Sequence, residues 1–166
     1  AQIGIQSSLT GHLVLSTVHT NSAVAAITRL RDMGIESYLL ASSLKTIIAQ
    51  RLVRRLCENC KLPDIPDRET LLKFDLESSS NCFKASGCDE CLDSGYKGRI
   101  AIAECITVDR SIKEMIHNNT SESEIADYAF KDNESIDQAS KNLITNGITS
   151  CDEILRVNNM KEDGSI

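Results

Sequence analysis

The chain has 166 residues, of which 41% are hydrophobic, 25% are charged and only 4% are aromatic, so a core of useful size must be aliphatic. Its net charge of −6 argues against a nucleic-acid-binding protein, which usually carries a basic face. No apolar run approaches the roughly 20 residues that cross a bilayer, and the N-terminus lacks the features of a signal peptide. We therefore expect a cytoplasmic protein without direct membrane insertion, and we read the start on Ala1 as a cut through a larger protein.

The first sixty residues alternate between helical and strand patterns. Residues 1–10 predict the end of a helix that stops at Thr10-Gly11, and the short apolar run 12–18 predicts a buried strand of a parallel sheet. A helix follows over 23–33, with Asn21 or Ser22 as its N-cap and Gly34 as its stop. From Ser37 a second amphipathic helix carries Leu40, Leu44, Ile47 and Ile48 on one face, and residues 51–56 either continue it or, as we prefer, form a strand.

The remainder of the chain changes character twice. Residues 57–99 are rich in turn-forming residues, with one short helix expected over 69–76 and a half-buried strand over 99–106. From Asp109 the pattern predicts four helices: one over 109–116, one that starts at Thr120, one over 135–145 and one over 149–157. The tail from Met160 is expected to be frayed.

Four of the seven cysteines form two CxxC pairs, separated by 27 residues. Each pair brings two thiolates within reach of one metal ion, and two pairs complete a closed tetrahedral site that suits structural zinc. The alternatives are unpaired buried cysteines or a redox CxxC, which needs a strand–helix context that is absent here. Cys82, Cys105 and Cys151 are expected to be small core residues, with Cys82 as a weak rival ligand. The predicted zinc ligands are Cys57, Cys60, Cys88 and Cys91.

His19 lies on the turn between the expected strand and the helix that follows it, together with Thr17. In open α/β sheets this edge binds ligands, so His19 is a candidate to hydrogen-bond a terminal phosphate or a nearby water. From spacing alone, a surface or satisfied core histidine is the commoner interpretation, and we adopt it for His12 and His117.

Several stretches together resemble one protein family. TGHLVLSTVHTN (10–21) looks like the histidine box of the ATPases of type II secretion and type IV pilus assembly. The similarity continues at 28–35 and 49–57, and it resumes at 95–99 and 147–150. The resemblance therefore covers nearly the whole chain, and the combination is more specific than any one piece.

The resemblance implies an α/β fold: the C-terminal part of a RecA-like P-loop ATPase core (1–56), a tetracysteine zinc-binding subdomain (57–106) and a C-terminal helical subdomain (107–166). It implies a homo-hexamer at the cytoplasmic face of the inner membrane that binds secretion or pilus platform proteins. There, ATP hydrolysis with Mg²⁺ powers type II secretion by pseudopilus assembly. His19 would be catalytic and lie near the γ-phosphate. Thr17, Arg29, Arg31 and Arg99 would be nucleotide-proximal or inter-subunit residues.

One departure from the family is large, because no GxxxxGK followed by Ser or Thr occurs in the chain. That loop holds the β- and γ-phosphates, so we expect the chain by itself to be inactive. The alternatives are a type IV pilus extension ATPase and a non-catalytic zinc-stabilised interaction module. For each arginine taken singly, salt bridges to carboxylates are the simpler interpretation. The arginines weighed in this way are Arg29, Arg31, Arg51, Arg54, Arg55 and Arg99.

Overall fold

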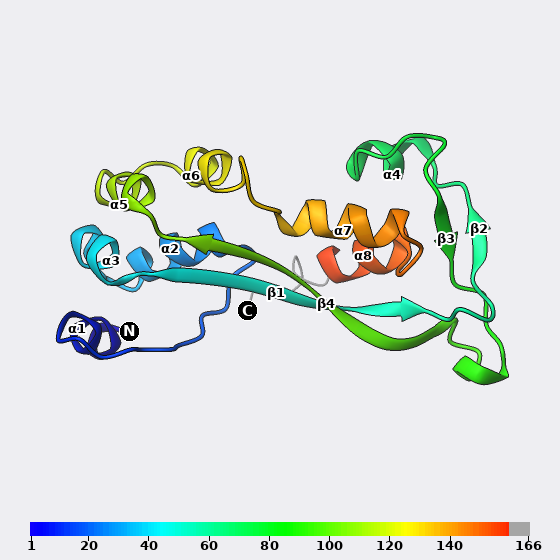
Figure 1. The fold of residues 1–166 in the computed structure, drawn as a ribbon, viewed down its shortest axis with the longest axis horizontal. Coiled ribbons are helices and arrows are strands. Elements are labelled where there is room, and N and C mark those ends of the chain that lie inside the picture. Colours follow the sequence, from blue (N-terminus) through cyan, green and yellow to red (C-terminus); the bar gives the residue numbers. More distant parts are fainter. Residues whose placement is uncertain (160–166) are drawn as a thin grey trace. The chain divides into compact units, whose positions relative to one another are not determined.

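In a computed structural model, residues 1–159 form a mixed α/β structure that divides into two compact units (Figure 1). Unit 1 comprises residues 1–49 and 104–135, and unit 2 comprises residues 50–103 and the described residues from 136 to 159. Strands β1 (Thr46–Leu56) and β4 (Tyr96–Thr107) pair with each other and contribute residues to both units. The domain boundaries expected at 56 and 106 stay a prediction, and the expected fraying from Met160 lies outside the described residues.

Unit 1 contains the helices α1 (Gln2–Leu9), α2 (Ala23–Asp32), α3 (Ser37–Ser43), α5 (Arg110–His117) and α6 (Glu122–Ala129). The local signals that predicted α2 are confirmed. The Ser22 hydroxyl accepts a hydrogen bond from the Ala25 N–H, and Gly34 adopts a φ of +81° just beyond the C-cap. Asp109 caps α5 in the same way, by accepting a hydrogen bond from the Ile112 N–H.

The core of unit 1 is aliphatic, as the low aromatic content predicts. Residues from α2, α3, α5, α6 and the end of β4 form one buried cluster. Such a cluster stabilises the unit by about 25 cal/mol for each Å² of apolar surface removed from water. Its largest fully buried members are Ile27, Leu40, Ile106, Ile116 and Ile125.

The strand expected over residues 12–18 is wrong. Residues 12–20 have no regular secondary structure, and Leu13 and Leu15 are each 88% exposed. A strand depends on backbone hydrogen bonds to a neighbouring strand. Within residues 1–159 no strand pairs with this segment, so its apolar pattern alone does not produce one.

The helix expected from Ser37 ends earlier than predicted. It stops at Ser43, and Ile47 and Ile48 lie on β1 rather than on a shared helical face. The run of β-branched residues that begins at Thr46 favours an extended backbone, and the strand preferred for 51–56 is confirmed as its second half.

Unit 2 consists of short elements around the cysteine pairs and two helices after Ser135. Strands β2 (Leu62–Asp64) and β3 (Cys82–Lys84) pair antiparallel, with Pro63 opposite Phe83. Helix α4 (Arg68–Lys73) and the 3₁₀ turn η1 (Asp89–Cys91) lie in the same stretch of unit 2, residues 50–103. Helices α7 (Ile136–Thr145) and α8 (Cys151–Asn159) complete the unit. Among the described helices, none has the length and hydropathy to cross a membrane.

Candidate metal centre and the histidine segment

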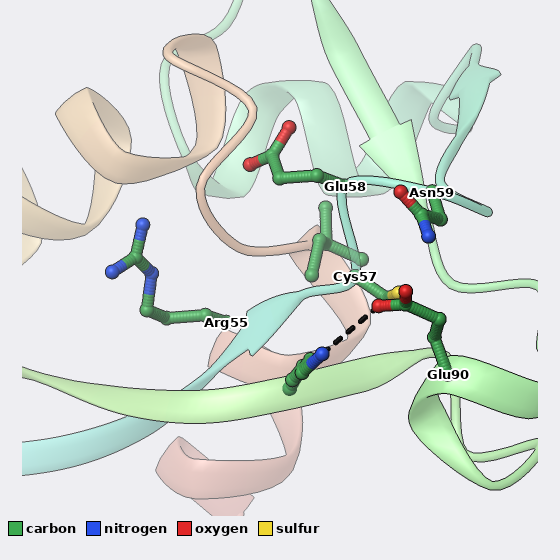
Figure 2. A pocket seen from close by; sticks show the side chains of 7 residues that line it. Arg55, Cys57, Glu58, Asn59 and Glu90 are labelled. Atoms are coloured by element: carbon green, nitrogen blue, oxygen red, sulfur yellow. Dashed lines mark hydrogen bonds and ion pairs between the residues drawn. The ribbon is translucent and has the colours of Figure 1, made fainter.

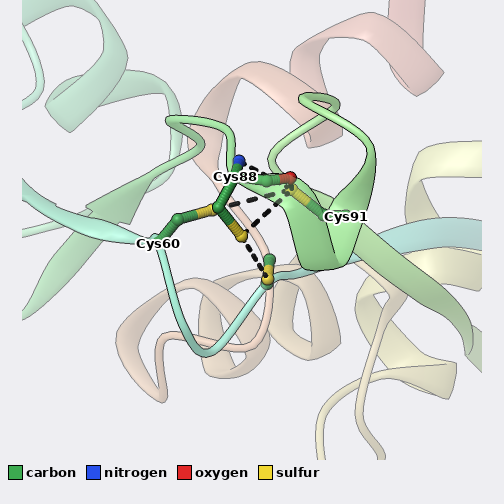
Figure 3. A group of neighbouring side chains, drawn as sticks. Cys60, Cys88 and Cys91 are labelled. Atoms are coloured by element: carbon green, nitrogen blue, oxygen red, sulfur yellow. Dashed lines mark hydrogen bonds between the residues drawn. The ribbon is translucent and has the colours of Figure 1, made fainter.

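The four predicted zinc ligands converge at one point, with every pair of sulfur atoms within 4.8 Å (Figure 3). Cys57 Sγ lies 3.8 Å from Cys88 Sγ, and Cys60 Sγ lies 3.8 Å from Cys91 Sγ. Four sulfurs around one zinc at about 2.3 Å form a tetrahedron with edges of roughly 3.8 Å. The spacing of the thiols therefore fits a closed four-thiolate zinc site.

The backbone between Cys88 and Gly95 wraps around one of these sulfurs. Cys91 Sγ accepts hydrogen bonds from the N–H groups of Cys88, at 3.3 Å, and of Gly95, at 3.2 Å. Such donors favour a negatively charged thiolate, which is the form that binds a metal. The Cys57 N–H donates to the Gly95 carbonyl at 2.9 Å, so the two CxxC turns are also joined directly by backbone.

The pKa values of the thiols reflect these contacts. Burial raises the pKa of Cys91, but the backbone hydrogen bonds from Cys88 and Gly95 outweigh it and lower the value to about 7. Burial raises the pKa of Cys60 to about 12. The hydrogen bonds at Cys91 therefore favour its thiolate form, which is the form that binds a metal.

Gly95 is required by this geometry. Its φ is +71°, and a Cβ at this position would lie 2.6 Å from the Ala85 Cβ and 3.0 Å from the Ser86 N. Gly98 also has a positive φ, of +81°, but a Cβ there would meet nothing within 4 Å. Both glycines thus allow turns beside the cysteines that other residues rarely adopt, but of the two only Gly95 also lacks the space for a side chain.

The other cysteines divide into buried and exposed positions. Cys82 and Cys151 are 3% and 5% exposed, so the prediction that they are core residues is confirmed. Cys105 is exposed, and for this residue the prediction is wrong because it lies on the outward face of β4. Cys82 is not a member of the four-cysteine cluster.

A surface pocket of about 240 Å³ lies beside Cys57 (Figure 2). It is smaller than typical sites for small molecules. Two of its carboxylates are already paired, Glu90 with Lys97 at 2.9 Å and Glu58 with Lys61 at 2.7 Å. We assign this pocket no ligand. Its lining residues are Arg55, Leu56, Cys57, Glu58, Asn59, Glu90 and Lys97.

The histidine segment is open, in contrast to the cysteine cluster. His19 and Thr17 are both exposed, and so are Arg29 and Arg99. Arg31 donates from Nη2 to the Ile116 carbonyl at 2.9 Å, near the end of α5, where the same oxygen also accepts from the Asn119 N–H at 3.2 Å. The proposed roles of these five residues stay predictions. His117 is exposed at the end of α5, as expected for a surface histidine.

Two buried glutamates were not predicted from the sequence. Glu153 is 1% exposed, and its carboxylate accepts hydrogen bonds from the guanidinium groups of Arg54 and Arg156 at 2.6–2.8 Å. Burial raises the pKa of Glu153, but the hydrogen bonds from the two arginines outweigh it and lower the value to about 2. The salt-bridge interpretation is confirmed for Arg54, whose guanidinium also stacks 4.1 Å from the centre of the Tyr96 ring.

The second buried glutamate, Glu104, is 4% exposed and lies on β4. The signal for it was present in the sequence, because residues 102, 104 and 106 face the same side of a strand and the outer two are isoleucines. A glutamate between them occupies a position that the pattern reserves for an apolar residue.

Fold and site together define a mixed α/β protein with a four-cysteine site of metal-binding geometry. The model of the family described as "Type II/IV secretion system protein" matches residues 1–156, so the chain belongs to that family. It is 45% identical to the type II secretion system ATPase E of Vibrio cholerae and 46% identical to the type II secretion system protein E of Pseudomonas aeruginosa. Each match covers 95% of this chain and 32% of the relative, so the chain spans about a third of these proteins.

Proposed function

We propose that this chain is part of a hexameric ATPase with a RecA-like core that powers type II protein secretion by driving pseudopilus assembly. The observation that carries the proposal is identity of about 45% over 95% of the chain to a protein named as a type II secretion ATPase. The names of the relatives favour secretion over pilus extension. The ATPase works in the cytoplasm, against platform proteins of the inner membrane.

The cysteine cluster serves this function as a structural zinc site. Four sulfur ligands leave no open coordination position for a substrate, so zinc there folds the segment around it and takes no part in hydrolysis. Residues 57–95 hold few buried apolar side chains, and a metal supplies the stability that such a small core lacks.

In the proposed ATPase, the histidine segment forms the edge that faces the nucleotide. An imidazole at His19 donates a hydrogen bond to the γ-phosphate or to the attacking water, with the Thr17 hydroxyl nearby in sequence. Arg29, Arg31 and Arg99 are candidates to stabilise phosphate charge within or between subunits. The phosphate-binding loop is not among the 166 residues, so this chain alone does not hydrolyse ATP.

The proposal is tested by ATP hydrolysis in the intact ATPase that carries this chain. His19→Ala should lower kcat about 100-fold, by removing a hydrogen bond made in the transition state, with no change in melting temperature. His117→Ala is the matched control and should keep the parent rate, because His117 is an exposed residue on α5. Parent-level turnover in His19→Ala would remove His19 from the site, and an intact protein without ATPase activity would overturn the proposed function.

A further inference from the structure

Strand β4 presents a carboxylate to the interior of unit 1. Along its end, burial alternates: Glu104 and Ile106 are buried, and Cys105 and Thr107 are exposed. Glu104 is therefore on the inward face, beside the aliphatic core, where an ionisable side chain is costly unless it has a specific partner. The partner of Glu104 therefore indicates its role.

Glu104 Oε1 accepts a hydrogen bond of 2.6 Å from the N–H of Ala23, which is the first residue of α2. The two residues are 81 positions apart in the chain. The first N–H groups of a helix have no partner within it and carry partial positive charge, so a carboxylate is their best acceptor. The short distance is typical of a bond in which the acceptor is charged.

The start of α2 is thereby held from two sides. Ser22 Oγ accepts from the Ala25 N–H at 3.1 Å, and Glu104 accepts from the Ala23 N–H. The turn before the helix is tied in as well, since the Thr20 hydroxyl donates to the Ser22 carbonyl at 3.1 Å. His19 directly precedes Thr20 in the chain. The exposed histidine segment therefore leads into the start of α2, which Glu104 holds through the Ala23 N–H.

We propose that Glu104 is a positioning residue for ATP hydrolysis: by anchoring the first turn of α2, it sets the place and direction of His19. This inference rests on the proposed function. In this role Glu104 acts through the Ala23 N–H and the turn that follows His19, not by contact with nucleotide. The alternative is a purely structural role, in which the carboxylate stabilises unit 1 without affecting the histidine.

Two variants separate the hydrogen bond from the charge. Glu104→Gln keeps a carbonyl oxygen at nearly the same place and so retains an acceptor for the Ala23 N–H. Glu104→Ala removes the acceptor and leaves a buried N–H without a partner. Glu153→Gln is the matched control, because Glu153 is also a buried glutamate but lies on α8 and pairs with Arg54 in unit 2.

The first measurement is amide hydrogen exchange in the intact ATPase that carries this chain. In the parent, the Ala23 N–H should be protected by its bond to Glu104. Glu104→Ala should accelerate its exchange at least tenfold, and Glu104→Gln should retain most of the protection. An unchanged exchange rate in Glu104→Ala would overturn the anchoring contact, whatever the catalytic results.

The second measurement is steady-state ATP hydrolysis in the intact ATPase. Glu104→Ala should lower kcat about 10- to 100-fold with KM changed less than about threefold, because a displaced His19 affects the transition state and leaves phosphate binding in place. Glu104→Gln should recover most of kcat. Glu153→Gln should lower the melting temperature and leave kcat of the folded enzyme unchanged.

The outcomes distinguish the positioning role of Glu104 from the proposed function. Parent-level kcat in Glu104→Ala, or an equal loss in Glu104→Ala and Glu153→Gln, would overturn the positioning role. If the alanine variant does not fold, Glu104→Asp decides in its place, because its shorter side chain withdraws the carboxylate from the Ala23 N–H. Parent-level kcat despite faster Ala23 exchange in Glu104→Asp would again overturn the positioning role. Absence of hydrolysis in the intact parent, with Ala23 protected as expected, would instead refute the proposed function.

Discussion

The cysteine cluster and the histidine segment are both candidate sites, yet they differ in how far the chain itself completes them. The four sulfurs already lie within 4.8 Å of one another, held by turns a few residues long and by backbone hydrogen bonds. Residues 12–19 are exposed and have no regular structure. A site built from local turns is thus formed by a short stretch of sequence, whereas a site on a sheet edge depends on neighbouring strands.

Among the substitutions that test this difference, loss of one cysteine ligand should have the largest effect on stability. Cys91→Ser is expected to abolish the binding of about one zinc per chain and to unfold residues 57–95, because the core there is too small without metal. Metal analysis and amide exchange would measure both effects. Cys105→Ser is the matched control, since that thiol is exposed and remote from the cluster. Full zinc content in Cys91→Ser would contradict the four-thiolate site.

The ion pairs of the buried Glu153 provide the next test. Glu153→Gln should lower the free energy of unfolding by about 3 kcal/mol, because it removes the charge of a buried carboxylate that accepts hydrogen bonds from the partly exposed guanidinium groups of Arg54 and Arg156. Denaturant titration would measure it. The histidine segment should not respond, and faster exchange at Ala23 in this variant would show that the two regions are less independent than we describe.

The same pair predicts how stability depends on pH. The pKa of Glu153 is lowered from 4.5 to about 2 in the folded protein, so its contribution is complete above pH 4.5 and is lost as pH falls towards 2. The parent should therefore lose more stability over this window than Glu153→Gln does. Parallel curves for the two proteins, recorded by urea unfolding at several pH values, would contradict the lowered pKa.

Gly95 allows a smaller and more local test of the metal centre. Gly95→Ala should cost about 2–4 kcal/mol, because its φ is positive and a Cβ would overlap Ala85. Gly98→Ala should cost only about 1 kcal/mol, since it has the positive φ but free space. Equal melting temperatures for the two variants would mean that the close contact with Ala85 does not matter.

The smallest effect is expected at the start of α2. Ser22→Ala should cost about 1 kcal/mol by removing the N-cap, as measured by thermal unfolding. The loss is small because Glu104 still holds the Ala23 N–H. A loss of several kcal/mol would show that Ser22, rather than Glu104, carries the anchoring of this helix.

The sequence predicted those parts of the molecule that depend on near neighbours. Ser22 and Gly34 marked the ends of α2, and the CxxC spacing identified four side chains that do converge. It failed where the partner is distant. Nothing in residues 12–18 states whether a neighbouring strand is present, and nothing near Glu104 indicates that its partner is Ala23. Cys105 was misplaced because its exposure follows from the strand register, which single-residue burial tendencies do not include.

The exposure of Cys105 makes it a convenient attachment point for a spectroscopic label. Burial raises the pKa of Cys151 to about 12 and also that of Cys82, so both stay protonated and unreactive at neutral pH. With the other four thiols bound to zinc, a maleimide dye should react at Cys105 alone. A fluorophore there would be the direct neighbour of Glu104, and its emission could report nucleotide-dependent changes at the start of α2 without any engineered cysteine.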